Sequence, residues 1–445
     1  MDIFIKASQF ILSLSLLIVL HELGHFIPAK LFKTRVEKFY LFFDYKFSLF
    51  KKKIGNTVYG IGWIPLGGYV KISGMIDESM DTEQMKQPAQ PWEFRSKPAW
   101  QRLIIMLGGV LVNFILAFVI YILALFTWGE SYLPNDSLKD GIWVTNSLGH
   151  DLGLQTGDKI KSIDGNEIEK FSSLMGEFVN GSEFVIEREG QNIEQIIPID
   201  FISKLIANEK GAFIQPRKPF VIGKLSEHSL NKESGLAPKD MIVGINGTPI
   251  RYFDQAKDLL KNYKNTPISL SVKRGNIQEE IIVQIDDDGL IGINLGNLSY
   301  DDMEKLGYYK LETNTYSFLE AIPAGITKGY RTMQGYVKQL KKVFNPETGA
   351  YKGLGGFISI GSIFPATWSW QAFWSITAFL SIMLGVLNLL PIPALDGGHV
   401  VFTLYEMVTN RKPSDKFLEY AQVTGFIILL SLLIFANAND FTKFF

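Results

Sequence analysis

Long apolar stretches alternate with polar ones along the 445-residue chain. Windows of about twenty apolar residues, enough to cross ~30 Å of hydrocarbon, lie near residues 4–26, 102–127, 370–391 and 416–436. The pattern therefore predicts four membrane-spanning helices, with both chain termini on the same side. Leu16–Leu20 lead directly into polar residues without a small-residue cleavage site, so we expect the first window to be a permanent span and not a signal peptide.

Basic residues predict how the chain is oriented. Residues 30–53, between the first two windows, are rich in lysine and arginine, and segments of that kind stay in the cytoplasm. Both termini are then expected on the opposite side of the membrane. The long region at about 129–316 is expected on that side as well.

This outer region contains an internal repeat. Residues 152–168 (LGLQTGDKIKSIDGNEI) match residues 234–250 (SGLAPKDMIVGINGTPI) at an offset of 82 positions. Each copy has a short apolar run that ends in Ile-Asp-Gly or Ile-Asn-Gly, which is a β-hairpin signal. The repeat predicts two similar β-rich modules of about 80 residues each.

Two further segments have distinctive patterns. Residues 54–74 are apolar and glycine-rich, and Ile64–Val70 (IPLGGYV) has strand residues interrupted by turn formers. Irregular backbone at membrane depth has to line a protein cavity. Residues 318–344 repeat apolar side chains at steps of three and four, which predicts an amphipathic helix. Such a helix lies along lipid headgroups or packs on a soluble domain, and the sequence leaves both open.

Composition narrows the possible classes of function. Charged residues are 20% of the chain and the mean hydropathy is +0.12, which favours contact with lipid over disorder. The net charge of −1 gives no field that would attract nucleic acid, so no nucleic-acid partner is expected. The absence of cysteine excludes disulfides, thiolate nucleophiles and cysteine-ligated metals. A metal site would have to use His, Asp or Glu.

A candidate metal motif lies in the first window. His21 and His25 are four residues apart in His-Glu-Leu-Gly-His, so their imidazoles project from one face of a helix, one turn apart. Two neutral imidazoles and a carboxylate suit zinc, and Glu22 is then placed to take a proton from water for amide hydrolysis. The alternative is a chance match. Three ionisable residues within a membrane span are costly unless they are functional, which favours the metal site.

The third ligand has two candidates near the end of the third window. Asp396 follows two prolines and precedes two glycines in the segment NLLPIPALDGGH, which would let it turn inward. His399 competes with it. We rank Asp396 first because a carboxylate completes a set of two histidines and one acid.

Together these segments resemble a known family. His21–His25 and Asn388–Gly398 are similar to the motifs of the site-2 protease family of intramembrane zinc metalloproteases, and the paired outer modules resemble its regulator of sigma-E protease branch. The resemblance covers nearly the whole chain. It implies a Zn²⁺ site with three ligands and a catalytic base: His21, His25, Asp396 and Glu22.

The resemblance also implies residues that bind the substrate. Asn388 is expected to hold the substrate backbone near the metal, and Pro391 to shape the bend beside it. A membrane-embedded β-hairpin, whose edge could pair with an unwound substrate strand, is implied at Ile64, Pro65, Leu66, Gly67, Gly68, Tyr69 and Val70.

The implied fold is a polytopic α-helical membrane protein with four transmembrane helices, the embedded β-hairpin and two tandem extracytoplasmic PDZ-like α/β modules. We expect an N-terminal membrane half at 1–128, PDZ-like modules at 129–215 and 216–300, an amphipathic linker helix at 301–345 and a C-terminal membrane half at 346–445. The implied location is the bacterial inner membrane, with the termini and both modules in the periplasm.

The chain departs from the family pattern at a few positions. Lys239 stands where the first module has Gly157, so a turn with positive φ would be strained there. Gly108-Gly109 and Phe357 replace expected Gly-Pro and proline, which puts the shapes of loops in question. The segment Gly289–Ile293 resembles a carboxylate-binding loop of PDZ domains, although a plain β-turn fits it equally well.

The expected function is regulated intramembrane proteolysis of single-span membrane proteins, such as anti-sigma factors and remnant signal peptides. The PDZ pair would filter or dock substrates that another protease has trimmed. The alternative is a catalytically silent PDZ scaffold in the membrane, which would lack the base or a ligand. A transporter is disfavoured because no repeat relates the four spans.

Overall fold

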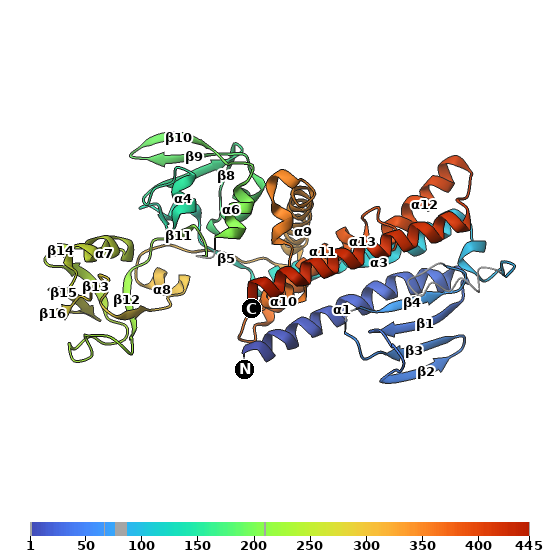
Figure 1. The fold of residues 1–445 in the computed structure, drawn as a ribbon, viewed down its shortest axis with the longest axis horizontal. Helices are drawn as coiled ribbons and strands as arrows, with labels where there is room; N and C mark the ends of the chain where they lie inside the picture. The colour runs from blue at the N-terminus through green and yellow to red at the C-terminus, as the bar shows by residue number, and fades with distance from the viewer. Residues whose placement is uncertain (1, 66, 76–86, 209–210, 445) are drawn as a thin grey trace. The chain divides into compact units, whose positions relative to one another are not determined.

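The computed structural model describes residues 2–65, 67–75, 87–208 and 211–444. It divides into two compact units (Figure 1). The membrane unit comprises Met1–Gly129, Thr315–Pro346 and Ala350–Phe445, and the β-rich unit comprises Glu130–Asn314 and Glu347–Gly349.

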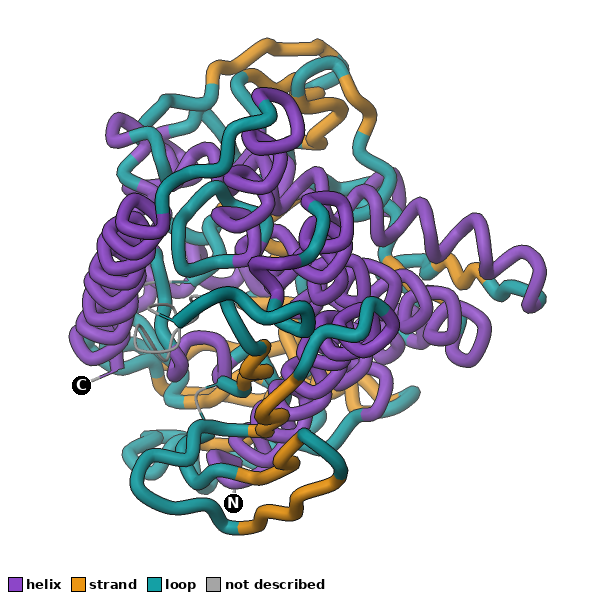
Figure 2. The backbone as a smooth tube through the Cα atoms, turned by 90° about the vertical axis from the view of Figure 1, so that its right-hand side faces the viewer, coloured by secondary structure: helices purple, strands orange, loops and turns teal. Residues whose placement is uncertain are grey.

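The membrane unit is organised around long apolar helices. In the described part of the chain, four helices are long and apolar enough to cross a membrane, as the four sequence windows predict. Helix α3 packs against both α1 and α11. The tube view distinguishes the helices, in purple, from the strands, in orange (Figure 2). The four helices are α1 (Asp2–Leu31), α3 (Ala99–Trp128), α11 (Trp370–Asn388) and α13 (Asp415–Phe444).

Glycines allow the backbones of α1 and α3 to come into direct contact. A Cβ atom on Gly24 would lie 2.4 Å from the carbonyl oxygen of Gly108 and 2.7 Å from Cα of Gly109. Real side chains do not tolerate such contacts, so both helices need glycine at this crossing. Gly108-Gly109 therefore lies inside a helix and not in a loop, which corrects the expectation that this substitution alters loop shape.

Helix α9 (Phe318–Val343) packs against α3 and α11. Its buried face includes Gly325, which lies against Ile122, and Gly329, which lies against Phe118. Ser317 caps its N-terminus by accepting a hydrogen bond from the backbone of Glu320. The amphipathic segment thus covers the transmembrane helices, a partner that the sequence alternatives did not include. The shorter helices of this unit are α10 (Phe357–Ser362) and α12 (Asp396–Thr409).

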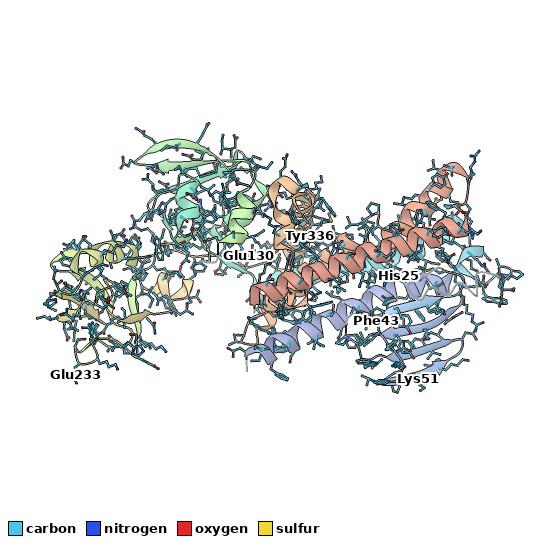
Figure 3. The ribbon with its side chains drawn as sticks, viewed as in Figure 1. His25, Phe43, Lys51, Glu130, Glu233 and Tyr336 are labelled. Atoms are coloured by element: carbon cyan, nitrogen blue, oxygen red, sulfur yellow. The ribbon has the colours of Figure 1, made fainter. Side chains whose placement is uncertain are left out.

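A small sheet packs on the second half of α1 (Figure 1). Its strands lie in the order β2-β3-β1-β4, with β1 parallel to β3 and antiparallel to β4. Lys51, on the terminal strand β2, lies on the side of the sheet away from α1 (Figure 3). The bounds are β1 (Val36–Leu41), β2 (Phe50–Ile54), β3 (Thr57–Ile61) and β4 (Tyr69–Ile72).

The expected hairpin at Ile64–Val70 is wrong in its topology. The hairpin in this sheet is β2–β3, whereas Tyr69 and Val70 lie on β4, which pairs with β1 at the opposite edge. Because β1 lies between β3 and β4 in the sheet, the chain has to pass β1 to reach β4. The alternation of apolar residues and glycines gave no sign of this strand order. Leu66 lies outside the described residues.

The first module of the β-rich unit forms a sheet in the order β10-β9-β7-β8 and a separate pair β11-β6. Its core includes Leu174, Phe178, Phe184 and Phe213, each almost fully buried. The elements are β6 (Ile142–Val144), α4 (Ser147–Asp151), β7 (Lys159–Ile163), β8 (Asn166–Glu167), α5 (Leu174–Asn180), β9 (Glu183–Arg188), β10 (Gln191–Ile196), α6 (Phe201–Ala207) and β11 (Ile214–Pro216).

The second module forms a sheet in the order β16-β15-β13-β12-β17, with β14 beside β13. Its separate core includes Phe220, Leu270 and Ile285. The elements are β12 (Phe220–Leu225), β13 (Met241–Ile245), β14 (Thr248–Pro249), α7 (Phe253–Leu260), β15 (Pro267–Arg274), β16 (Ile277–Gln284) and β17 (Ile293–Leu295).

The internal repeat corresponds to one structural motif that occurs twice. The pair β13–β14 repeats β7–β8 at the same offset of 82 residues. Asp158 receives two hydrogen bonds from Arg188, and Asp240 receives two from Arg274. Hydrogen bonds from Arg274 hold the pKa of Asp240 below its usual value. Each module thus has a buried carboxylate that ties its hairpin to a neighbouring strand.

The turn before this hairpin has positive φ in both modules. Gly157 has a φ of 104° and Lys239 a φ of 73°, so the lysine occupies the strained conformation that the sequence comparison predicts. In the segment that resembles a carboxylate loop, the backbone N–H of Leu290 donates to the Asp286 side chain and that of Gly289 to the Asp286 carbonyl. Those donors are already used, which favours the plain turn.

Residues after the second module return to the first. Helix α8 (Tyr300–Lys305) contributes Met303 to the first core, and β18 (Glu312–Asn314) pairs with β5 (Glu130–Tyr132). The linker helix expected at 301–345 is therefore shorter, since α9 begins only at Phe318.

Candidate active site

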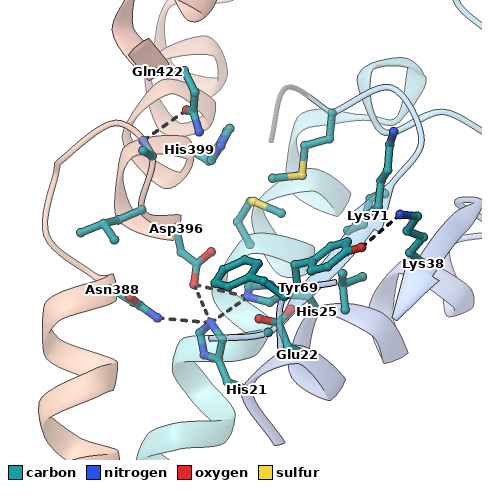
Figure 4. Close-up of a pocket in the computed structure, with 18 of the residues that line it drawn as sticks. His21, Glu22, His25, Lys38, Tyr69, Lys71, Asn388, Asp396, His399 and Gln422 are labelled. Carbon is teal, nitrogen blue, oxygen red and sulfur yellow. Dashed lines mark hydrogen bonds and ion pairs between the residues drawn. The ribbon is translucent and has the colours of Figure 1, made fainter. Parts of the chain in front are cut away.

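Two histidines on α1 meet one aspartate at the start of α12 (Figure 4). Nε2 of His21 lies 3.3 Å from Nε2 of His25, and Oδ2 of Asp396 lies 3.4 Å and 3.3 Å from these two nitrogens. Among the described residues, they are the one group of three or more His, Asp or Glu side chains close enough to hold a metal ion. The two sequence motifs therefore lie side by side in the structure, although His25 and Asp396 are 371 positions apart in the chain.

The distances fit a tetrahedral metal ion. Zinc binds imidazole nitrogen and carboxylate oxygen at ~2.0–2.1 Å, and a tetrahedron of that size has edges of about 3.3 Å. The three observed separations of 3.3 to 3.4 Å match that edge. Oδ2 of Asp396 is buried and has no hydrogen-bond partner in the described structure. Such an atom is costly unless a cation or donor pairs with it.

Helix α3 forms the wall behind both imidazoles. Nδ1 of His25 lies 2.8 Å from the carbonyl oxygen of Ile105, so it donates a hydrogen bond and leaves Nε2 for the metal. A Cβ atom on Gly109 would lie 2.3 Å from Nε2 of His25 and 2.6 Å from Cε1 of His21. The glycine therefore makes room for the two rings.

A sharp bend brings Asp396 to the histidines. Helix α11 ends at Asn388, and the chain passes through Ala394, whose φ of +79° is unusual for a residue with a side chain. The side chain of Gln422 on α13 accepts a hydrogen bond from the Ala394 backbone at 3.2 Å and holds this strained residue.

The two glycines after Asp396 have a different role from the one expected. They begin helix α12, where a Cβ on Gly397 would lie 2.2 Å from the carbonyl oxygen of Leu390 and one on Gly398 2.6 Å from that of Ile392. Glycine is needed at both positions because the backbone of the bend packs directly against the first turn of α12. Conformational freedom of the glycine backbone is not the reason.

A cavity of about 590 Å³ opens onto the three residues. Glu22 lines it beside the histidines (Figure 4), where its carboxylate can act on a molecule in the cavity. His399 lines the cavity too, outside the group of three ligand atoms. The geometry therefore favours Asp396 over His399 as third ligand.

The expected substrate-binding residues divide into two groups. Asn388 lines the cavity and its Nδ2 lies 3.2 Å from Nε2 of His21, whereas Pro391 lies exposed in the bend. From the predicted hairpin, Gly68, Tyr69 and Val70 line the cavity.

The other hairpin residues lie elsewhere. Ile64 makes a β-bridge to Phe43, Gly67 lies close to the ring of Phe43, and Pro65 is exposed. Phe43 lies on the sheet side of α1 (Figure 3).

Tyr69 lines the cavity and is fixed by several contacts. Its ring is stacked between Tyr40 and Phe43, and its hydroxyl donates to Asp44 at 2.8 Å. Lys38 donates to the same hydroxyl. Strand β4 therefore borders the site with a rigid side chain.

Sequence reasoning missed several residues of the site. Asn113 and Gly109 on α3 and Gln422 on α13 all contact the histidines or the bend. One signal was present, because Asn113 and Gln422 are amides within strongly apolar windows and such residues are usually paired.

Comparison with known proteins agrees with this geometry. Residues 9–432 match the sequence model of peptidase family M50. The chain belongs to peptidase family M50. A regulator of sigma E protease from Haemophilus influenzae is 28% identical over 98% of both chains, and regulator of sigma-E protease RseP from Escherichia coli is 27% identical over 98% of both. A Vibrio cholerae protein named as a zinc metalloprotease is 28% identical over 99% of both.

Membership of family M50 establishes the class of activity. The protein is a zinc metalloendopeptidase of the site-2 protease type, in a chain with apolar helices of membrane-spanning length. The resemblance seen in the sequence is thereby confirmed, and zinc is the cofactor.

Separate substitutions of Asp396 and His399 test which of them is the third zinc ligand. We expect Asp396→Asn to weaken zinc binding by more than about 100-fold, because residues that only orient a ligand already contribute ~10–100-fold. We expect His399→Gln to bind zinc as the wild type does. The measurement is zinc affinity of the purified chain by competition with a chelator. Loss of zinc from His399→Gln alone would reverse the assignment.

Proposed function

We propose that this M50 peptidase cuts single-span membrane proteins at a zinc site formed by His21, His25 and Asp396. The observation that carries the proposal is the spacing of the three candidate ligand atoms, which lie 3.3 to 3.4 Å from one another. One of them, Oδ2 of Asp396, is buried without a hydrogen-bond partner in the described structure. Zinc bound there supplies Lewis acidity to water and to the scissile carbonyl.

Glu22 is the general base in this proposal. It follows His21 directly on α1 and lines the cavity, so its carboxylate can take a proton from the attacking water. The same carboxyl group then gives the proton to the amine that leaves. Asn388, whose amide nitrogen lies close to Nε2 of His21, donates a hydrogen bond to the substrate backbone.

The substrate is a transmembrane segment that has to unwind before it is cut. A helix uses its carbonyl groups in internal hydrogen bonds, so they are not available to the site. Strand β4 is the last strand of its sheet and borders the cavity. An unwound substrate strand that pairs with β4 would keep its backbone groups satisfied while it lies across the histidines.

The β-rich modules select substrates in this proposal. We assign them as PDZ-like domains in the periplasm, with the lysine-rich residues 30–53 in the cytoplasm, in a bacterial inner-membrane protein. Relatives are named for regulation of sigma-E, which supports anti-sigma factors as one substrate class. Remnant signal peptides are the second substrate class in this proposal. Trimming by another protease would precede cleavage.

Replacing the base separates binding from catalysis. We expect Glu22→Gln to keep zinc and to cut a single-span test substrate ~10²–10⁴-fold more slowly, because general-base catalysis contributes about that factor. Glu419→Gln changes an exposed acid of the same unit and should cut normally. Normal turnover by Glu22→Gln would remove Glu22 from the mechanism, and a silent scaffold would show no cleavage by any form.

The inactive variant also allows the substrate strand to be located. The chain has no cysteine, so Val70→Cys on β4 introduces a single thiol. In the Glu22→Gln background we expect it to form a disulfide with a cysteine near the cleavage bond of the test substrate. Crosslinking that favours a cysteine at the exposed Lys51 on β2 would contradict pairing with β4.

Removing the modules tests their selective role. Glu130 pairs with Asn314, so residues 133–311 can be excised and the gap closed by a short Gly-Ser linker that keeps β5 and β18. We expect the shortened chain to cut substrates that still carry a folded outer domain, which the full chain rejects. Unchanged selectivity would contradict the filter.

A further inference from the structure

Asn113 contacts the first zinc ligand from behind. It lies on α3, is fully buried, and its Nδ2 is 3.1 Å from Nδ1 of His21. Its Oδ1 is buried and has no hydrogen-bond partner in the described residues. Helix α11 fixes the position of this residue, because the Ser381 hydroxyl donates a hydrogen bond to the backbone carbonyl oxygen of Asn113 at 2.7 Å.

The protonation of His21 determines which amide atom can face it. Nε2 of His21 points to Asp396 and His25. When Nε2 binds a metal, the proton of the neutral ring sits on Nδ1, which then has to donate. An amide NH₂ group cannot accept that hydrogen bond, whereas the amide oxygen can.

Two arrangements follow from this constraint. Without metal, Nδ1 of His21 can accept from Nδ2 of Asn113, the amide atom that faces it in the structure, while Nε2 of His21 faces Asp396, His25 and Asn388. With metal, a half-turn of the amide brings Oδ1 to Nδ1–H. That rotation gives up no hydrogen bond made by Oδ1, since it makes none among the described residues.

We propose that Asn113 is a positioning residue for the zinc site, whose amide oxygen accepts the Nδ1–H of His21 and fixes its tautomer. The proposal deepens the proposed function and rests on its ligand set. His25 already has an equivalent partner, the carbonyl of Ile105, on the same helix. Helix α3 thus provides one acceptor behind each imidazole, which keeps both Nε2 atoms directed at the metal.

Three variants of the full chain test the acceptor role. Asn113→Leu has a similar size and cannot accept, so we expect zinc affinity to fall ~10–100-fold. Asn113→Asp accepts and cannot donate, so we expect zinc affinity close to that of the wild type. The control, Thr377→Val, removes a buried hydrogen bond between α11 and Ser13 of α1 without touching His21, and should bind zinc normally.

The readouts are zinc affinity by chelator competition, the visible spectrum of the Co²⁺-substituted protein, and thermal unfolding of each metal-free form. We expect the Co²⁺ spectrum to change in Asn113→Leu and to be preserved in Asn113→Asp. If both Asn113 variants bind zinc like the wild type, the backbone near Gly109 orients His21 alone and the proposal is wrong. It is also wrong if Asn113→Asp loses as much affinity as Asn113→Leu, or if Thr377→Val does.

Failure of the proposed function would look different. In that case Asp396→Asn would bind zinc as well as the wild type, whatever the result at Asn113. Loss of zinc by Asp396→Asn with no effect of either Asn113 variant overturns the present inference alone.

Discussion

Two imidazoles and a carboxylate buried in an apolar helix bundle have to compensate one another, and the membrane unit is built around this requirement. Each polar group would be costly alone in such surroundings. Their ligand atoms lie 3.3 to 3.4 Å apart, so a single divalent cation can satisfy all three. A metal ion held there would contribute to the stability of the chain as well as to its chemistry.

The bundle achieves this arrangement through glycine and strained backbone. Gly24 and Gly108 allow α1 and α3 to touch, and Gly109 leaves space for the imidazoles. On the other side, Ala394 adopts positive φ so that Asp396 can turn back to the histidines. Small residues and one strained turn thus create a polar point within helices that are otherwise suited to lipid.

Sequence predicted the chemistry better than the connections. The spacing of His21 and His25 fixes their common face, and the 82-residue repeat reappears as β7–β8 and β13–β14, because both depend on local geometry. The crossing from β3 to β4 and the packing of α9 on α3 depend on contacts between distant segments, which periodicity does not encode. The roles of Asn113 and Gln422 at the site were not predicted either. Both are amides in apolar windows, but the groups that they contact lie on segments far apart in sequence.

X-ray absorption at the zinc edge of the purified full-length protein tests the central claim most directly. We predict nitrogen and oxygen ligands at ~2.0–2.1 Å, with outer-shell scattering from two imidazoles, and loss of the carboxylate contribution in Asp396→Asn. Scattering from three imidazoles, or a spectrum unchanged by that substitution, would contradict the account.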